Sequence, residues 1–309
     1  MPLQQAPINY RQSDHHADQD HIAGFVGNSS GSTRTGILYQ YKVETIIDFA
    51  RSDKTTQIYK DYQTARTNAI NKGAKHYTAA ECFNNEGEAK SKYDLGNGIE
   101  LTILYNYYYF NKSSDENNYS VCTLLTYNEH HFMFTGDLEK DGEEKLASYY
   151  NGSTPAKTLP KVDLFKAGHH GSKTSSNDCL LKLIEPKIVC VCCCAGGSEY
   201  TNQYKNTFPT QDMINRVAKY TDRVYVTTYY DEKATTYKSL NGNIIISSNG
   251  NTIGVSASNN ITKLKDSKWF NETIYVKSGI YHCSGTGKKD YYTSATSGTS
   301  AVPRRVWPS

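Results

Sequence analysis

The chain has 309 residues, 37% of them hydrophobic, and its 34 basic and 31 acidic residues give a net charge of +3. This length allows one large domain or two modest ones, with a substantial core in either case. The near balance of charge argues against tight, sequence-independent binding to DNA by charge alone. The sequence contains no run of 18 apolar residues, so it predicts no membrane span.

The eight cysteines do not resemble a disulfide framework. Four of them fall in the stretch VCVCCC at 189–194, where we expect a buried strand with cysteine as a small hydrophobic residue. Adjacent cysteines cannot all pair within disulfide geometry, which favours a reducing or anaerobic setting. A zinc-binding cysteine cluster is the alternative, although the sequence lacks the two separate C-x-x-C pairs that are typical of such a site.

Hydrophobic periodicity predicts strands and helices in alternation through the middle of the chain. Residues 41–50 predict a strand, 56–73 an amphipathic helix that ends at Gly73, and 98–110 one or two strands. The further predicted elements are a hairpin over 119–136, a helix over 139–152, a strand over 161–168, a helix over 175–186, a strand over 187–194, a helix over 210–221, a strand over 222–230 and a hairpin over 241–257.

This alternation, with hairpins on either side, predicts an α/β fold of packed layers. We expect one domain over 1–255. Residues 256–309 are expected to form a C-terminal extension, and its Ser-, Thr- and Gly-rich composition predicts that it is partly flexible.

The stretch DHHADQDHIAG, residues 14–24, is the first candidate for a functional site. It sets His16, Asp18, Asp20 and His21 in the pattern H-x-D-x-D-H, just before the small and apolar IAGF. Two imidazoles and two carboxylates in one crevice would repel one another or lose solvation unless a cation lay between them. The alternative is a solvated loop of acidic and histidine residues.

Two later stretches add side chains of the same kind at strand ends. Asp137 follows an apolar strand in FMFTGDLE, and His169 and His170 follow another in LFKAGHHGS. Taken singly, the first pattern is more often a turn and the second more often structural. Three strand ends that deliver His and Asp to one edge of a layered sheet would assemble a two-cation hydrolytic site.

In this order, H-x-D-x-D-H-x-x-G, T-G-D-L-E and H-H-G-S-K-T-S resemble the metallo-β-lactamase-fold superfamily, and most closely its ComEC-type branch of DNA-uptake hydrolase domains. The resemblance extends from about residue 14 to 255. It implies a four-layer αββα sandwich with metal ions at the sheet edges. The ligands that it implies are His16 and Asp18 at site one, Asp20 and His21 at site two, Asp137 between both ions, and His170, with His169 as the alternative, at site two.

The resemblance also implies a mechanism, in which a metal-bound hydroxide attacks phosphorus or a carbonyl carbon. Asp20 is then also catalytic, and His169 points at a phosphoryl or leaving oxygen. Ser172 and Lys173 are candidates for holding the oxyanion, with capping and surface solvation as alternatives. Asn206, which stands where relatives carry a histidine, is a third candidate for contacting the substrate.

Two departures from the family pattern modify these expectations. An Asn-rich segment with Glu116 and no histidine precedes the strand that leads to Asp137, and such oxygen-rich sites suit Mn²⁺ or Mg²⁺ better than a zinc tetrahedron. We therefore expect one or two divalent ions, Zn or Mn. The first motif also begins at residue 16, about fifty residues earlier than the fold requires. This predicts an N-terminally truncated fold whose exposed sheet edge favours a homo-oligomer. No signal peptide is visible, but a secreted full-length parent remains compatible with such a truncation.

Three functions follow from these patterns. The leading hypothesis is a metal-dependent hydrolase of phosphodiester bonds, with small molecules and nucleic acid as candidate substrates. The second keeps the site but changes the bond to a β-lactam, a lactone or a carboxylic ester, because this fold supports many chemistries. The third is a truncated or degenerate module without turnover.

Overall fold

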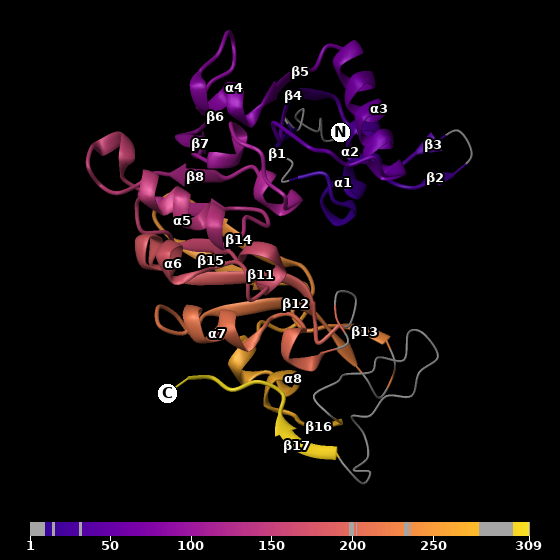
Figure 1. The fold of residues 1–309 in the computed structure, drawn as a ribbon, viewed down its shortest axis with the longest axis vertical. Helices are drawn as coiled ribbons and strands as arrows, with labels where there is room; N and C mark the ends of the chain where they lie inside the picture. Colours follow the sequence, from indigo (N-terminus) through magenta and orange to yellow (C-terminus); the bar gives the residue numbers. More distant parts are fainter. Residues whose placement is uncertain are drawn as a thin grey trace, which may run out of the picture. The chain divides into compact units, whose positions relative to one another are not determined.

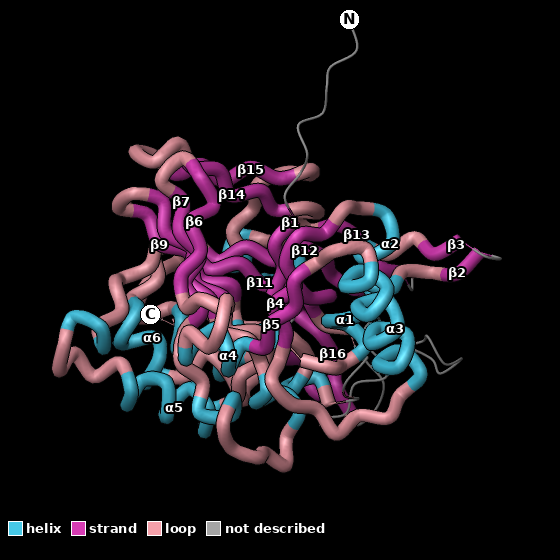
Figure 2. Tube along the Cα trace, turned by 90° about the horizontal axis from the view of Figure 1, so that it is seen from above, coloured by secondary structure: helices cyan, strands magenta, loops and turns pink. Residues whose placement is uncertain are grey.

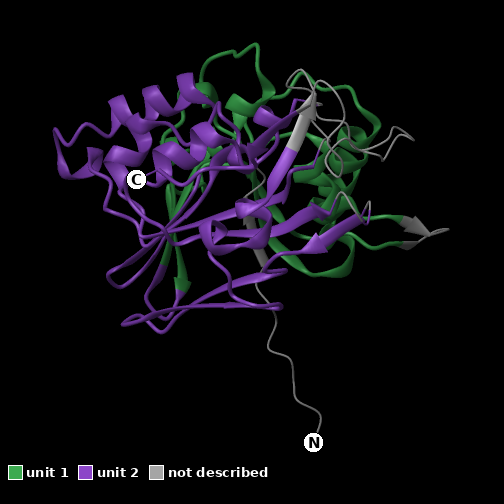
Figure 3. Ribbon diagram, turned by 90° about the horizontal axis from the view of Figure 1, so that it is seen from below, with its two compact units in different colours: residues 1–95, 100–124, 135–138 green, residues 96–99, 125–134, 139–309 purple. Residues whose placement is uncertain are grey.

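The computed structural model describes residues 10–13, 16–30, 33–197, 201, 203–231, 234, 236–277 and 299–308. The chain divides into two compact units (Figure 3). Unit 1 comprises residues 1–95, 100–124 and 135–138, and unit 2 comprises residues 96–99, 125–134 and 139–309. Strands and helices alternate along the chain, and the largest sheet has eight strands. The predicted α/β class is therefore confirmed.

Unit 1 contains a small parallel sheet with helices packed on it. The sheet has the order β1-β4-β5, and all its pairs are parallel. Its strands are β1 (Tyr10–Ser13), β4 (Val43–Asp48) and β5 (Lys75–Thr78). The other elements are α1 (Gln19–Val26), the short pair β2 (Ser29–Ser30) and β3 (Thr33–Arg34), α2 (Ile37–Gln40), α3 (Gln57–Asn71), α4 (Ala79–Asn84), and the 3-10 turns η1 (Tyr107–Tyr109) and η2 (Glu116–Tyr119).

The strand predicted over 41–50 and the helix predicted over 56–73 are confirmed as β4 and α3. The Thr56 side chain accepts a hydrogen bond from the Tyr59 backbone N–H and so caps the first turn of α3. Along α3, Tyr62 is fully buried, and its ring lies 6.1 Å from that of Phe25 and 6.2 Å from that of Phe49, between centroids. This aromatic packing, rather than helix propensity, fixes the face that α3 turns to the core.

The eight-stranded sheet has the order β13-β12-β11-β10-β9-β8-β7-β6. Its four strands β9 to β12 run parallel, and β11 and β12 lie side by side (Figure 2). In chain order the strands are β6 (Lys92–Gly96), β7 (Ile99–Ile103), β8 (Thr123–Tyr127), β9 (His130–Phe134), β10 (Leu164–Lys166), β11 (Ile188–Ala195), β12 (Val224–Asp231) and β13 (Thr236–Ser239).

Unit 2 adds helices, one hairpin and one further pair of strands. These elements are α5 (Lys140–Tyr149), α6 (Asp178–Ile184), α7 (Gln211–Val217), α8 (Lys268–Asn271), the hairpin of β14 (Ile244–Ser248) and β15 (Ile253–Ala257), the pair of β16 (Thr273–Lys277) and β17 (Thr299–Pro303), and the 3-10 turns η3 (Pro155–Lys157), η4 (Gly168–Gly171), η5 (Tyr204–Asn206) and η6 (Leu264–Asp266). Within the described ranges, no helix has the length and apolar character needed to cross a membrane.

The strand expected to continue to residue 110 is wrong in its second half. Strand β7 ends at Ile103, and Tyr107–Tyr109 form the 3-10 turn η1. The buried Asn106 ends the extended run. Its side-chain oxygen accepts from the Tyr108 N–H, while its amide donates to two carbonyl oxygens of the segment 118–120. A buried amide with these partners holds the chain in a turn that aromatic composition alone does not reveal.

The described part of the C-terminal segment 256–308 packs on unit 2. Trp269 and Phe270 are 3% and 2% exposed, and β16 pairs with β17 at the yellow end of the ribbon (Figure 1). Arg305, 4% exposed, donates to the carbonyl oxygens of Pro209 (2.9 Å) and Thr207 (2.7 Å), among other acceptors. The domain boundary predicted between residues 255 and 256 stays a prediction, because the two compact units do not divide the chain at or near this position.

Replacing Arg305 by alanine is expected to lower the free energy of unfolding of unit 2 by about 3 kcal/mol, because buried carbonyl oxygens lose their donors. The guanidinium reaches the 204–209 loop from a distant part of the chain. Urea unfolding followed by tryptophan fluorescence would measure the change. A midpoint equal to that of Lys265→Ala, a control that removes a half-buried surface ion pair with Asp222 in the same unit, would contradict this role.

Candidate metal centre

The histidines and aspartates of the first motif lie where β1 leads into α1. Asp18 is the extended N-cap residue of α1, and Asp20 and His21 follow in its first turn. His16 is 1% exposed, whereas Asp20 faces solvent. The strand-to-helix turn thus presents the four side chains from one short segment. Asp14 and His15 of the same stretch lie outside the described residues.

Asp137 joins this segment within unit 1. Its Oδ2 lies 3.0 Å from His21 Nε2, which is also 3.8 Å from Asp20 Oδ2. Asp20, His21 and Asp137 each offer a ligand atom, and these three atoms lie within 4.8 Å of one another. The rings of His16 and His21 are 4.1 Å apart between centroids. Residues separated by more than a hundred positions therefore form one compact set of carboxylate and imidazole donors, which we call the unit 1 cluster (His16, Asp18, Asp20, His21 and Asp137).

The protonation of this cluster suits a cation. The neighbouring His16 ring, together with Lys54, lowers the pKa of Asp18 to about 2 against the effect of burial. Burial lowers the pKa of His21, although Asp137 opposes the shift, and this favours the neutral imidazole that binds metals. His16 Nε2 is buried and lies 3.5 Å from Asp18 Oδ2 without forming a hydrogen bond in the described part of the chain. A buried imidazole nitrogen facing a carboxylate fits a shared cation.

Ser120 supports the cluster from the other side. Its hydroxyl oxygen lies 3.3 Å from His16 Nδ1, accepts a hydrogen bond from the Asp137 backbone N–H at 2.9 Å, and donates to the Asn117 carbonyl. One buried hydroxyl therefore positions both ends of the cluster. The role of Ser120 was not predictable from the sequence, because the only signal of this residue is its place after the Asn-rich segment.

In unit 2, His169 and His170 lie in the turn η4, directly after β10. Their φ angles of 44° and 53° fall in the left-handed region, which non-glycine residues rarely adopt and which recurs at functional sites. His169 Nδ1 lies 3.1 Å from Glu139 Oε1. His170 Nδ1 donates to the Cys192 carbonyl oxygen at 2.7 Å, and its ring stacks on Phe208. Donation from Nδ1 leaves Nε2 as the basic nitrogen of a neutral His170.

The other predicted residues of unit 2 lie in two groups. Lys173 Nζ donates to Asn206 Oδ1 at 3.2 Å, so the structure brings these two together. Ser172 is 6% exposed and turns its hydroxyl to Thr174, whose N–H and Oγ1 lie 3.2 and 2.9 Å from it. Ser172 thus has a local partner in its own turn, in line with the capping alternative.

A buried carboxylate that the sequence analysis missed supports the His169–His170 turn. Glu143 on α5 is fully buried and accepts from the backbone N–H groups of Ser176 and Asn177, both at 2.7 Å. The Ser176 hydroxyl in turn accepts from the Gly168 N–H at 3.1 Å. Burial raises the pKa of Glu143 to about 7, even though these donors favour the carboxylate. Glu143 had no sequence signal beyond its place in a predicted helix.

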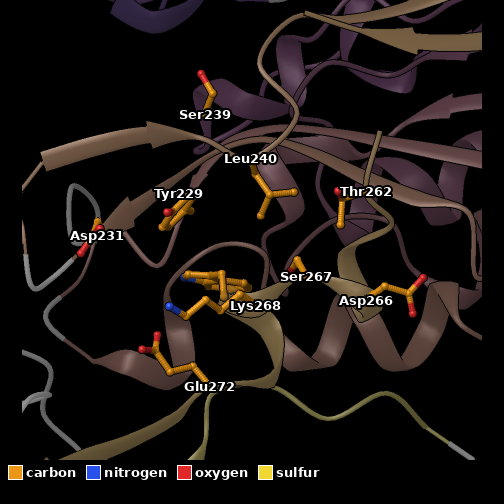
Figure 4. A pocket seen from close by; sticks show the side chains of 10 residues that line it. Tyr229, Asp231, Ser239, Leu240, Thr262, Asp266, Ser267, Lys268 and Glu272 are labelled. Carbon is orange, nitrogen blue, oxygen red and sulfur yellow. The ribbon is translucent and has the colours of Figure 1, made fainter. Parts of the chain in front are cut away.

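A cavity of about 240 Å³ lies in the C-terminal part of unit 2 (Figure 4). Asp231, Asp266, Lys268 and Glu272 are among its lining residues, as are Tyr229 on β12 and Leu240, which directly follows β13. None of the predicted site residues lines it. Because its charged groups are mixed, its lining favours no single class of ligand.

Comparison with known proteins relates the middle of the chain, which carries part of the candidate site, to one superfamily. Residues 115–195 match the family model of the metallo-beta-lactamase superfamily. The match includes Asp137 and the segment 169–173, whereas the segment 16–21 lies before it.

Three relatives align with about a third of the chain. It is 33% identical over 106 residues to competence protein ComA of Neisseria gonorrhoeae, which covers 34% of this chain and 14% of the relative. It is 29% identical over 109 residues to recombination protein 2 of Haemophilus influenzae, covering 35% and 12% of the two proteins. It is 26% identical over 111 residues to ComE operon protein 3 of Bacillus subtilis, covering 36% and 12%.

The matched segments thus span only 12–14% of the length of these relatives. The family match nevertheless falls on the segment that carries Asp137 and the two neighbouring histidines, and the large sheet with its helices agrees with the superfamily's fold. Over the matched segment the chain is therefore similar to the metallo-beta-lactamase superfamily and to ComEC-type competence proteins, and its α/β architecture is consistent with that fold.

Proposed function

We propose that this chain is a metal-dependent hydrolase of phosphodiester bonds. The observation that carries the proposal is the close approach of Asp20, His21 and Asp137, whose donor atoms lie within 4.8 Å of one another in unit 1. Carboxylates and neutral imidazoles at this spacing suit a divalent cation. The names of the relatives refer to competence and recombination, which supports nucleic acid as a candidate substrate.

We assign His170 to the same set of ligands from the pairing of the strands. Strands β9 and β10 run parallel, with Phe134 opposite Lys166. Asp137 follows the first of these residues by three positions, and His170 follows the second by four. Because neighbouring parallel strands deliver their carboxyl ends to one edge of a sheet, this register favours a shared site. The hydrogen bond from His170 Nδ1 to Cys192 favours His170 over His169 as the ligand.

The donors then sort into two groups. His16 and Asp18 would hold one cation, Asp20, His21 and His170 the other, and Asp137 would contact both. Carboxylate oxygens make up half of the six donors, which favours Mn²⁺ at the first position, while the imidazoles leave Zn²⁺ compatible with the second.

The remaining side chains have the properties that hydrolysis of a phosphodiester needs. Bound divalent cations would lower the pKa of water and offset charge on the phosphoryl oxygens. Asp20, which is exposed, would accept a proton from the attacking water. His169, oriented by Glu139, would donate a hydrogen bond to the leaving oxygen. Lys173, held by Asn206, would attract the anionic substrate.

The test is metal content and activity of the same preparation. The protein is purified without added metal or chelator, and elemental analysis counts ions per chain. We expect one to two equivalents of Mn or Zn, and hydrolysis of bis-p-nitrophenyl phosphate that stops in chelator and returns with Mn²⁺. A chain that neither contains nor takes up Mn²⁺ or Zn²⁺ would overturn the proposal. If the protein hydrolysed nitrocefin and not the phosphodiester, the result would favour the β-lactam hypothesis for the same site.

Replacing Ser120 by alanine is expected to weaken metal binding by about tenfold to a hundredfold without unfolding the protein. The variant keeps every ligand but removes the hydroxyl that positions His16 and the Asp137 backbone. Competition with a chelating dye would measure the affinity. The matched control is Ser148→Ala, whose exposed hydroxyl donates to the Glu144 carbonyl within α5. Equal affinities for the two variants would rule out a positioning role for Ser120.

A further inference from the structure

Unit 1 contains a second cavity, of about 390 Å³, that no part of the proposed mechanism uses. It lies beyond the carboxyl end of β4, and its lining begins at Phe49, directly after that strand. The charged residues in its lining are Arg51, Asp53, Arg66 and Lys112, with His76 beside them. Three fixed cations against one carboxylate give the wall an excess of positive charge.

The cations differ in how firmly they are held. The Arg51 guanidinium donates through Nε and Nη2 to the carbonyl oxygens of Tyr109 (3.4 Å) and Phe110 (3.1 Å), which fixes its plane. Lys112 is exposed. Arg66 forms an ion pair with the fully buried Asp48, and this carboxylate offsets its charge. Arg51 and Lys112 therefore supply the charge that remains for a ligand.

The buried Asp48 carboxylate already has hydrogen-bond and ion-pair partners, so the cavity lining offers mainly donors to a ligand. Asp48 accepts from Tyr62 and lies 2.8 Å from His76 Nε2, in addition to its pair with Arg66. Asp53 is the one acidic residue in the lining, and it is exposed. A planar guanidinium held by backbone carbonyls and an ammonium group that lines the same cavity together match the oxygens of a phosphate group.

The cavity lies beside the unit 1 cluster, because consecutive residues line the one and contact the other. Asp53 lines the cavity, and its neighbour Lys54 pairs with Asp18 at 2.6 Å. Tyr119 lines the cavity, and its neighbour Ser120 contacts His16. If one phosphate of a polyanionic ligand lay at the unit 1 cluster, a neighbouring phosphate of the same ligand would therefore lie in the cavity, at Arg51 and Lys112.

We propose that this cavity binds a phosphate group of the substrate that neighbours the one to be hydrolysed, so that the substrate is an oligonucleotide rather than an isolated phosphodiester. The cavity's affinity for phosphate stands on the residues above. Only its place in the substrate site rests on the proposed hydrolytic function.

The first experiment measures phosphate binding without metal. Isothermal titration calorimetry with pyrophosphate, in the presence of chelator, compares the wild-type chain of 309 residues with its Arg51→Met/Lys112→Met variant. We expect the double variant to bind at least about tenfold more weakly, because two charge-assisted contacts are lost. The control Lys72→Met/Lys90→Met removes the same net charge from exposed lysines of unit 1 outside the cavity, and should bind as the wild type does. Lys112→Met alone, which breaks no backbone contact of Arg51, keeps the test valid if the double variant is unstable.

Asp137→Asn separates this site from the unit 1 cluster. We expect it to bind pyrophosphate in chelator as the wild type does. If it weakens binding as much as the double variant does, or if the lysine control loses as much affinity, the phosphate lies elsewhere and the proposal is overturned. Absence of pyrophosphate binding to the wild type overturns it as well.

The second experiment tests the place of the cavity in the substrate site. With Mn²⁺, Arg51→Met/Lys112→Met should raise KM for a short single-stranded oligonucleotide about tenfold, with kcat unchanged, and leave hydrolysis of bis-p-nitrophenyl phosphate unaltered. Equal effects on both substrates would overturn this assignment. A wild type that binds pyrophosphate but hydrolyses neither substrate would refute the proposed function while leaving the phosphate site intact.

Discussion

Asp137→Asn is expected to lower kcat for phosphodiester hydrolysis by about a thousandfold or more while leaving the fold intact. Asp137 is 2% exposed and lies 3.0 Å from His21, so its charge acts in a nearly solvent-free part of unit 1. Asparagine keeps the size of the side chain and the backbone bond to Ser120, but it removes the anion that would contact both cations. Losing several kcal/mol of charge stabilisation corresponds to three orders of magnitude in rate. Steady-state kinetics with bis-p-nitrophenyl phosphate and Mn²⁺ would measure the loss.

Asp141→Asn is the matched control, because Asp141 is an exposed residue near the start of α5 that pairs with Lys145. It should retain wild-type activity and metal content. If Asp137→Asn binds metal and turns over at the wild-type rate, the unit 1 cluster is not the metal site. If it loses metal but the wild type has no activity, the site binds a cation for another purpose.

Glu143→Ala is expected to lower the free energy of unfolding by about 3–5 kcal/mol. The variant leaves the N–H groups of Ser176 and Asn177 without their buried acceptor, and each such group costs about 1–3 kcal/mol in addition to the cavity that forms. The midpoint of urea unfolding would report the loss. The Ser176 hydroxyl accepts a hydrogen bond from the Gly168 N–H at the start of η4. We therefore also expect the alanine variant to disturb the conformation of the His169–His170 turn at denaturant concentrations below the unfolding midpoint.

Glu143→Gln distinguishes charge from shape. In the folded protein the pKa of Glu143 is raised to about 7 from its ordinary 4.5, chiefly by burial, so the folded state holds this proton more tightly than the unfolded chain. The stability that the group confers is therefore complete below about pH 4.5 and declines as the pH rises to about 7. Glutamine cannot titrate, and its variant should lose this part of the pH dependence. If the free energy of unfolding of the wild type and of Glu143→Gln changed with pH in the same way, the raised pKa of Glu143 would be refuted.

The parts of the site that the sequence predicted are those with a local pattern. Asp20 and His21 stand in one motif, and Asp137 follows a strand whose apolar run is plain, so their meeting at a strand end could be expected. The strand β4 and the helix α3 were likewise visible from periodicity alone. The metal and catalytic roles of these residues stay predictions until they are tested.

What the sequence did not reveal depends on pairs of residues far apart in the chain. Ser120 contacts His16 across 104 positions, and Glu139 meets His169 across 30. Neither has a spacing that a single sequence can show. The helix α4 is different, because Thr78 and Glu81 form a capping box whose T-x-x-E pattern was present and overlooked.

The bond from His170 to Cys192 has a consequence for how this protein can be probed. The acceptor is the main-chain carbonyl, so the Cys192 thiol takes no part in holding the imidazole. A mutational scan of β11 would pass over this position, since any side chain there leaves the carbonyl in place. Cys192 is also the exposed cysteine among those described. A small fluorophore attached to its sulfur would therefore label the residue whose carbonyl holds His170, without replacing any atom that holds the ring.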